Sequence, residues 1–268
     1  MKQADKHTFS TLSLNSENMY HGHLILVNRY HPIRWQNDDG ILLNRMRLID
    51  GIHHNIMLEH TAAAMLGKLL KACNAEHGIV PVSGYRSKAE QKNIYDQSLY
   101  ENGLEFTKQY VARPNESEHQ TGMAIDVGER KEEIDFICPS FPDHGVCRTF
   151  RQRASEYGFI KRYAKEKEQL TGISDEPWHF RYVGYPHAAL MEKHQLCLEE
   201  YIQFLKNYEF HGEHLLVDDE AIEIYYVKAG ETVTQIPLVD GARCEISGNN
   251  VDGFIVTLFH QEYSDGYR

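Results

Sequence analysis

The spacing of apolar and polar residues predicts a mixture of helices and short strands up to about residue 207. Helices are expected where apolar residues recur near the 3.6-residue period or follow a capping box, over 55–74, 87–103, 148–157 and 187–207. Strands are expected where short apolar or β-branched runs lie between breakers, over 23–28, 79–83, 123–127, 158–160 and 178–183. This span has the length of one domain of about 200 residues.

After residue 207 the pattern changes to short strands separated by turn-forming residues. Strands are expected over 221–227, 232–236 and 253–259, with a turn-rich segment before the last of them. We therefore expect three parts, namely a loosely held polar arm over 1–22, a domain over 23–208 and a small all-β appendix over 209–268.

Composition narrows the classes of partner. The chain has 268 residues, 28 basic and 39 acidic, so its formal charge is −11, and no basic face for nucleic acid or anionic lipid is expected. No apolar run approaches the ~20 residues of a membrane span. The polar start lacks the apolar segment of a secretory signal, which predicts a cytoplasmic protein. The alternative is an extracellular or membrane-anchored protein whose leader is not included.

The five cysteines are an odd number, are widely spread and include no C-x-x-C pair. This usage predicts free thiols in a reducing compartment. Cys138 and Cys147 bracket a predicted loop, and they are the pair that an oxidant would join.

Sixteen histidines make a metal site worth seeking, and the segment from Ser117 to Asp126 offers two ligand types. His119 ends a loop and Asp126 lies in the strand that follows, while Gly122 lets the backbone turn between them. Strand alternation points the neighbours of Asp126 into the core, so its carboxylate faces the open side. A catalytic zinc site needs three protein ligands and one open position.

A second segment, Glu176-Pro-Trp-His179, supplies a further ligand and a base. Pro177 excludes a helix interior, so the pair is expected on a turn that enters a strand. His179 would be the third ligand. Glu176 would take a proton from the metal-bound water, whose pKa zinc lowers to about 7.

A third segment, Ser83-Gly-Tyr-Arg-Ser87, places Arg86 after a buried strand. A fixed guanidinium there suits the oxyanion that develops when a peptide carbonyl is attacked. Ser117 is two residues before the first ligand and is a candidate substrate contact. Taken singly, each of these residues is more often structural than functional. Their joint occurrence in three segments indicates a hydrolytic metal site, which the other histidine pairs, 53–54 and 211/214, do not complete.

These segments resemble a known family. S-E-H-Q-T-G-M-A-I-D matches the S-x-H-x-x-G-x-A-x-D pattern of the zinc D-alanyl-D-alanine carboxypeptidases, E-P-W-H matches their E-x-W-H, and S-G-Y-R-S matches their arginine-bearing strand end. The sequence is similar to the VanY-type enzymes and the bifunctional VanXY-type dipeptidase/carboxypeptidases of vancomycin resistance, over roughly residues 24–205.

The resemblance implies an α+β fold with a small antiparallel sheet and flanking helices, of the zinc D,D-peptidase and hedgehog-like type. It implies one zinc per chain, bound by His119, Asp126 and His179, with Glu176 as base and Arg86 stabilising the transition state. The substrate contacts would be Ser117, Tyr85 and Gln91. The implied substrates are peptidoglycan precursors or dipeptides that end in D-Ala-D-Ala.

Two other functions stay open for this sequence. One is a phage-type endolysin of the same metal fold that cuts L-Ala-D-Glu bonds, with the appendix as a wall-binding module. The other is a non-catalytic relative that keeps zinc without turnover, against which the intact Glu176 argues. Release of D-Ala from a D-Ala-D-Ala-ended pentapeptide separates the three.

Overall fold

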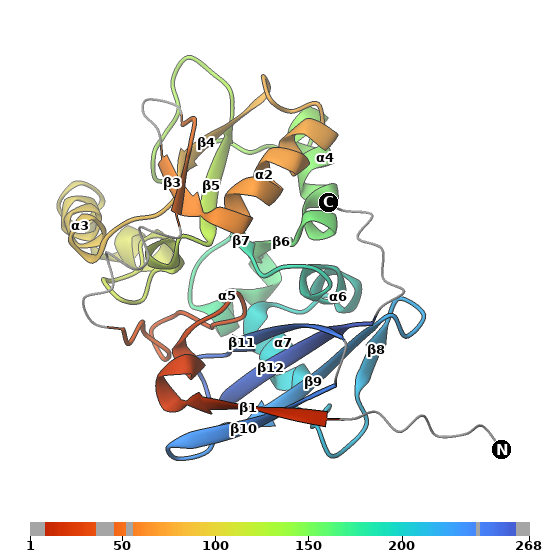
Figure 1. Cartoon of the computed structure of the whole chain (residues 1–268). Coiled ribbons are helices and arrows are strands. Elements are labelled where there is room, and N and C mark those ends of the chain that lie inside the picture. The colour runs from red at the N-terminus through yellow and green to blue at the C-terminus, as the bar shows by residue number, and fades with distance from the viewer. Residues whose placement is uncertain (1–8, 36–45, 52–55, 240–241, 261–268) are drawn as a thin grey trace. The chain divides into compact units, whose positions relative to one another are not determined.

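The computed structural model describes residues 9–35, 46–51, 56–239 and 242–260 (Figure 1). The chain divides into two compact units. The first unit combines Met1–Leu26 with Glu200–Arg268, and the second unit is Val27–Glu199. Each unit is described by itself below.

The second unit is built on a four-stranded sheet in the order β4-β5-β7-β6, in which each neighbouring pair is antiparallel. Its strands are β4 (Ile79–Ser83), β5 (Ala124–Glu129), β6 (Phe159–Tyr163) and β7 (Glu176–Tyr182). A separate antiparallel pair is formed by β2 (Met46–Ile49) and β3 (Ile56–Glu59). The predicted α+β fold with small antiparallel sheets is confirmed.

Helices flank this sheet (Figure 1). They are α2 (His60–Ala72), α3 (Lys88–Tyr110), α4 (Gly145–Arg153), α5 (Glu168–Thr171) and α6 (His187–His194), with 3-10 turns η2 (Glu118–Thr121), η3 (Ala154–Tyr157) and η4 (Lys165–Lys167). Part of the core is an aromatic cluster of Phe141, Phe150 and Phe180, whose ring centroids lie 5.0–5.7 Å apart in edge-on contacts. This cluster lies on the face of β7 opposite to His179, because strand neighbours alternate.

The first unit is mostly β-structure. Its larger sheet has the order β11-β12-β9-β8, and the strands are β8 (Leu215–Val217), β9 (Ile222–Lys228), β11 (Arg243–Gly248) and β12 (Gly253–Phe259). The 3-10 turn η1 (Ser16–Tyr20) follows β1 (Phe9–Asn15), which pairs with β10 (Val233–Val239), as Figure 1 shows. Tyr225, Ile236, Phe254, Val256 and Leu258 form its core. The helix α7 (Leu198–Leu205) contains the boundary between the units.

The predicted loose arm over 1–22 is wrong in its described part. Residues 9–15 form β1, which pairs residue by residue with β10 from Phe9 opposite Val239 to Asn15 opposite Val233. A single edge strand gives little sequence signal, because its pairing partner lies more than 200 residues away. The start of the arm, residues 1–8, lies outside the described residues.

Two predicted elements have a different form. The apolar run Leu24–Val27 is buried but irregular, and the backbone N–H of Leu24 and of Leu26 donates to Ser247 Oγ (2.9 Å) and Asn249 O (3.0 Å). The helix predicted over 187–207 is two helices, because Gln195 adopts a left-handed φ of 54° and ends α6. Both errors come from tertiary contacts and a single backbone angle that apolar spacing does not encode.

Helix starts follow local chemistry more closely than apolar spacing. The predicted helix over 55–74 begins at His60, because residues 56–59 form β3 and the Glu59 carboxylate accepts from the N–H groups of Thr61 (2.8 Å) and Ala62 (2.9 Å). The predicted capping box at Ser87 and Glu90 is confirmed. That helix continues to Tyr110 past a kink at Gly103. Within the described residues, no helix is both long and apolar enough to cross a membrane.

Candidate active site

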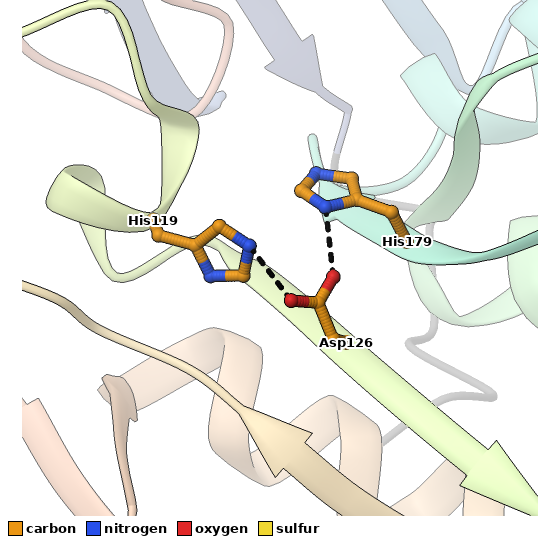
Figure 2. Close-up of side chains that lie close together, drawn as sticks. All are labelled: His119, Asp126 and His179. Carbon is orange, nitrogen blue, oxygen red and sulfur yellow. Dashed lines mark hydrogen bonds and ion pairs between the residues drawn. The ribbon is translucent and has the colours of Figure 1, made fainter. Parts of the chain in front are cut away.

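The three predicted metal ligands meet on one side of the central sheet. His119 comes from η2, Asp126 from β5 and His179 from β7, and Figure 2 shows the two imidazoles directed at the carboxylate from either side. His119 Nε2 lies 3.1 Å from Asp126 Oδ2, and His179 Nδ1 lies 2.9 Å from Asp126 Oδ1. The antiparallel register of β5 and β7 places Asp126 opposite His179.

The turn between His119 and Asp126 requires its glycine. Gly122 has a φ of 73°, in the left-handed region, and its N–H donates to His119 O at 3.1 Å. A side chain at this position would also collide with Met46. Beyond the turn, the neighbours of Asp126 in β5, Ile125 and Val127, are fully buried, as strand alternation predicts.

His119 is held with one nitrogen toward Asp126. Its Nδ1 lies 2.7 Å from the carbonyl oxygen of Gly84. A carbonyl oxygen can accept but not donate a hydrogen bond, so the proton of the neutral ring is on Nδ1. Burial, assisted by the nearby Arg86 guanidinium, lowers the pKa of His119 to about 4. The ring is therefore neutral, with a lone pair on Nε2, which is the form that binds metals.

His179 lies between two carboxylates. Its Nδ1 faces Asp126, and its Nε2 lies 3.7 Å from Glu118 Oε2. Burial lowers the pKa of His179, but the two carboxylates outweigh it and raise that pKa to about 9. The surroundings of this ring thus stabilise positive charge, whether a proton or a metal ion carries it.

The donor set fits zinc. The ligand atoms of His119, Asp126 and His179 all lie within 4.8 Å of one another, and all three residues are buried. Two imidazole nitrogens and one carboxylate oxygen are a ligand set of catalytic zinc sites, which leave a fourth position open. A second histidine–carboxylate cluster in the first unit, His214 and His260 on Glu223, does not form such a set among the described residues.

Arg86 reaches the ligands from the loop after β4. Its Nη2 lies 2.8 Å from Asp126 Oδ2, and its Nε donates to Ser83 Oγ at 2.7 Å. Gln91 supports the same guanidinium from α3, with Oε1 at 3.5 Å, while its own Nε2 donates to Ala112 O at 2.7 Å. The predicted cation is therefore beside the predicted metal ligands, and it is oriented by two neutral side chains.

Glu176 lies near Nδ1 of His179, whereas Glu118 lies near Nε2. It opens β7 and pairs with Tyr163, so Glu176 and Pro177 belong to the strand and not to a turn before it. Its Oε2 is 3.6 Å from His179 Nδ1. Burial raises the pKa of Glu176 to about 8, in the range that suits a general base or acid at neutral pH.

These groups line one pocket. Its polar wall contains Arg86, Gln91, Ser117, Glu118, His119, Asp126, Glu176 and His179, and its apolar wall includes Tyr110, Phe136, Tyr163 and Trp178. Of the predicted substrate contacts, Ser117 and Gln91 therefore face the pocket. Tyr85 is not among the lining residues, and its backbone N–H donates to Met57 O at 2.7 Å.

Sequence reasoning missed Glu118 and the arginines behind it. Glu118 Oε1 lies 2.9 Å from Arg162 Nε and 3.0 Å from Arg181 Nη1, and all three side chains are fully buried. Burial raises the pKa of Glu118, but the two guanidiniums outweigh it and hold that pKa far below the usual range. One signal was available, since Arg181 follows His179 by two residues and so shares its face of β7.

Comparison with known proteins agrees with this geometry. Residues 55–185 match the family model VanY, D-alanyl-D-alanine carboxypeptidase. The bifunctional D-Ala-D-Ala dipeptidase and D-Ala-D-Ala carboxypeptidase VanXYC of Enterococcus gallinarum is 43% identical over 183 residues, which cover 68% of this chain and 94% of that protein.

Two solved structures are similar along the chain. The vancomycin resistance D,D-dipeptidase VanXYg, in complex with a D-Ala-D-Ala phosphinate analogue, has a TM-score of 0.87 and 46% identity, covering 94% of this chain and all (100%) of that one. A mutant D,D-pentapeptidase VanY from a VanB-type resistance cassette, in complex with Zn(II), has a TM-score of 0.53 and 30% identity, covering 67% and 98%. The predicted family and enzyme class are confirmed: the chain belongs to the VanY family of D-alanyl-D-alanine carboxypeptidases, which are hydrolases of the zinc metallopeptidase type.

Proposed function

We propose that this chain is a zinc-dependent D,D-carboxypeptidase that removes the terminal D-Ala from peptidoglycan precursors ending in D-Ala-D-Ala. The observation that carries the proposal is the convergence of His119, Asp126 and His179 beside Glu176 in one pocket. D,D-dipeptidase activity is part of the proposal, because two of the similar proteins bear that activity in their names. The biological consequence would be loss of the peptide end that vancomycin binds.

His119, Asp126 and His179 would hold one zinc ion per chain. Bound there, zinc would act as a Lewis acid on the scissile carbonyl and would lower the pKa of a water molecule to about 7. Two observations support zinc at this place. The tautomer of His119 leaves a lone pair on Nε2, and all three residues line the pocket.

The other steps of the reaction are assigned to side chains of this chain. Glu176 takes the proton of the attacking water and passes it to the amine of the departing D-Ala, since its carboxylate lines the pocket 3.6 Å from His179 Nδ1. The Arg86 guanidinium stabilises the negative charge that grows on the carbonyl oxygen. Ser117 and Gln91 would contact the peptide from the pocket wall, with Tyr85 as a further candidate outside it.

The test is D-Ala release from D-Ala-D-Ala and from a pentapeptide with the same end, with and without a chelator. We expect release from both, its loss with chelator and its return with zinc. His119→Ala should lose bound zinc by metal analysis, whereas the exposed control His77→Ala should keep it. Zinc binding without any release would favour the non-catalytic relative, and cleavage of an L-Ala-D-Glu bond would favour the endolysin.

We also propose that residues 209–268 are dispensable for the chemistry. The candidate groups between Arg86 and His179 all lie in the second unit. Because β1 pairs with β10, a cut after residue 208 would divide the first unit, so the cleaner fragment is 27–199. This fragment should bind zinc and release D-Ala.

A cytoplasmic location belongs to the same proposal. Its support is that all five cysteines are free, including Cys138 and Cys147, as a reducing compartment favours. Thiol labelling of the denatured protein, taken from cells under conditions that block exchange, should find five reactive thiols.

A further inference from the structure

A second cleft adjoins the active-site pocket within the second unit. Its wall comes from residues 28–30, the end of α3, residues 112–116 and the end of α5. Val111, Ala112, Tyr163 and Ile173 line both this cleft and the active-site pocket. The two cavities are therefore neighbours that share part of their lining.

The charge of this cleft is opposite to that of the chain. Arg29, Lys108 and Arg113 line it and are exposed, while Glu116 is the acidic residue among its lining residues. The chain as a whole has a formal charge of −11. A local excess of cations beside the catalytic site attracts anions there, although the rest of the surface repels them.

The cations are placed by neighbours that leave them facing solvent. The Arg29 guanidinium lies 4.7 Å from the ring centroid of Tyr30. It also packs over Gly172, where an added Cβ would lie 3.3 Å from Arg29 Cζ. Contacts with Tyr95 and Glu116 raise the pKa of Arg113. The Arg29 guanidinium thus has a defined place in the cleft wall, whereas Lys108 Nζ lies 3.4 Å from the exposed Glu105, which offsets part of its charge.

A third cleft gives an internal contrast. It shares Ile94, Phe136 and Ile137 with the active-site pocket, and its charged lining residues are Glu101 and Asp135. Two clefts therefore adjoin the active-site pocket, one with mainly cationic charged residues and one with acidic ones. An anionic substrate segment is favoured in the first and disfavoured in the second.

We propose that the cleft of Arg29, Lys108 and Arg113 binds the part of the substrate upstream of D-Ala-D-Ala, through an anionic group of that part. The group can be a side-chain or main-chain carboxylate of the peptide, or a phosphate of a carrier attached to it. This inference rests on the proposed D,D-carboxypeptidase function and names a substrate class for it, namely anionic peptidyl-D-Ala-D-Ala. A free D-Ala-D-Ala dipeptide is too short to use the cleft.

The experiment compares two N-acetylated pentapeptides that end in D-Ala-D-Ala and differ only in glutamate or glutamine at one upstream position. The wild-type chain should have the lower KM for the glutamate peptide, and added salt should reduce the difference. The triple variant Arg29→Gln, Lys108→Gln, Arg113→Gln should raise that KM about three- to tenfold, as expected for exposed charges. Hydrolysis of D-Ala-D-Ala and of the glutamine peptide should be unchanged.

Matched variants separate a local effect from net charge. Lys71→Gln, Lys193→Gln and Lys228→Gln together remove the same charge from exposed positions outside the cleft, and they should leave both pentapeptides unaffected. Arg29→Lys with Arg113→Lys keeps the charge and should keep the preference. Inhibition of glutamate-peptide cleavage by inorganic pyrophosphate, lost in the triple variant, would identify phosphate as a second anion source.

The outcomes are distinguishable from those of the parent proposal. If no D-Ala-D-Ala-ended substrate releases D-Ala, the proposed function itself is wrong. If release occurs but the triple variant changes neither the peptide preference nor pyrophosphate inhibition, the function stands and the cationic cleft is not a substrate site. An equal change in the triple-lysine control would also overturn the inference.

Discussion

Besides Asp126, two carboxylates lie near the His179 imidazole, and their surroundings shift their pKa values in opposite directions. We call the Nε2 side the buried side, because Glu118 there has a fully buried side chain although it also lines the pocket; it is 3.7 Å from Nε2 and lies against Arg162 and Arg181. On the pocket side, Glu176 is 3.6 Å from Nδ1. Burial raises the pKa of both, but only behind the ring do two guanidiniums outweigh it, so Glu118 stays ionised while the pKa of Glu176 rises to about 8.

In our proposal, this difference separates a positioning role for Glu118 from a proton-transfer role for Glu176. Glu118 is a negative charge 3.7 Å from His179 Nε2, and two guanidiniums suppress its protonation. Burial raises the pKa of Glu176 to about 8, because among the described residues no guanidinium contacts it as closely as Arg162 and Arg181 contact Glu118. When neighbouring titratable groups are pushed apart in pKa, their roles can be assigned from their surroundings. The following variants test that assignment, from the largest expected effect to the smallest.

Removing the carboxylate on the pocket side should have the largest effect on turnover. Glu176→Gln should lower kcat by about 10²–10⁴, the usual range for loss of a general base, and should keep bound zinc. The neighbouring control Asp175→Asn, whose residue does not line the pocket, should retain activity. Steady-state D-Ala release with parallel metal analysis measures both. A Glu176→Gln variant with wild-type kcat would mean that another group moves the proton.

Removing the Arg86 guanidinium on the pocket side should lower kcat less than removing the Glu176 carboxylate. Arg86→Ala should lower kcat by about 10²–10³, as loss of one oxyanion donor typically does. The structure adds a second interpretation, because Arg86 also lies 2.8 Å from Asp126, a proposed zinc ligand. The zinc content of the variant distinguishes these two interpretations. Lost turnover with retained zinc supports transition-state stabilisation, whereas lost zinc would assign Arg86 to holding Asp126.

Removing the charge on the buried side should weaken metal binding more than chemistry. Glu118→Gln keeps the size of the side chain but not its charge, and we expect about 10–100-fold weaker zinc binding, as for other carboxylates behind a ligating histidine. Competition with a chromogenic chelator measures this affinity in the purified protein. With zinc in excess, kcat should largely recover. Unchanged affinity, equal to that of the exposed control Glu192→Gln, would remove Glu118 from the metal site.

The pocket side was accessible to sequence reasoning and the buried side was not. Arg86, His119, Asp126, Glu176 and His179 stand in three short segments with recognisable spacing, and the structure brings all five together. Glu118 occupies a variable letter between two motif positions. Its role appears only when Arg162 and Arg181, from β6 and β7, pack against it.

Fold prediction succeeded where the signal was local. Buried strands such as β4 and β5, and the capping box before α3, are fixed by neighbouring residues, and they were predicted within a few positions. β1 and the irregular segment Leu24–Val27 depend on residues more than 200 positions later, including Ser247 and Asn249. Hydrophobic spacing carries no information about such partners, so these parts required the structure.

The smallest predicted effect concerns stability, at the outer end of the arginine cluster. Glu199 accepts from Arg162 Nη1 (2.9 Å) and Nη2 (2.7 Å). Burial raises the pKa of Glu199, but this bidentate pairing outweighs it and the pKa is lowered. A carboxyl with a lowered folded-state pKa stabilises the fold at neutral pH. That stabilisation is lost as the pH falls below about 4.3, where the unfolded chain takes up the proton first.

In chelator-treated protein, chemical denaturation should therefore show that Glu199→Gln lowers the free energy of unfolding by about 1–3 kcal/mol at pH 7, the value of hydrogen bonds to charged groups. The loss should shrink toward pH 4, whereas Glu192→Gln should follow the wild type throughout. A deficit that stays constant with pH would mean that Glu199 stabilises the fold through packing and not through its charge.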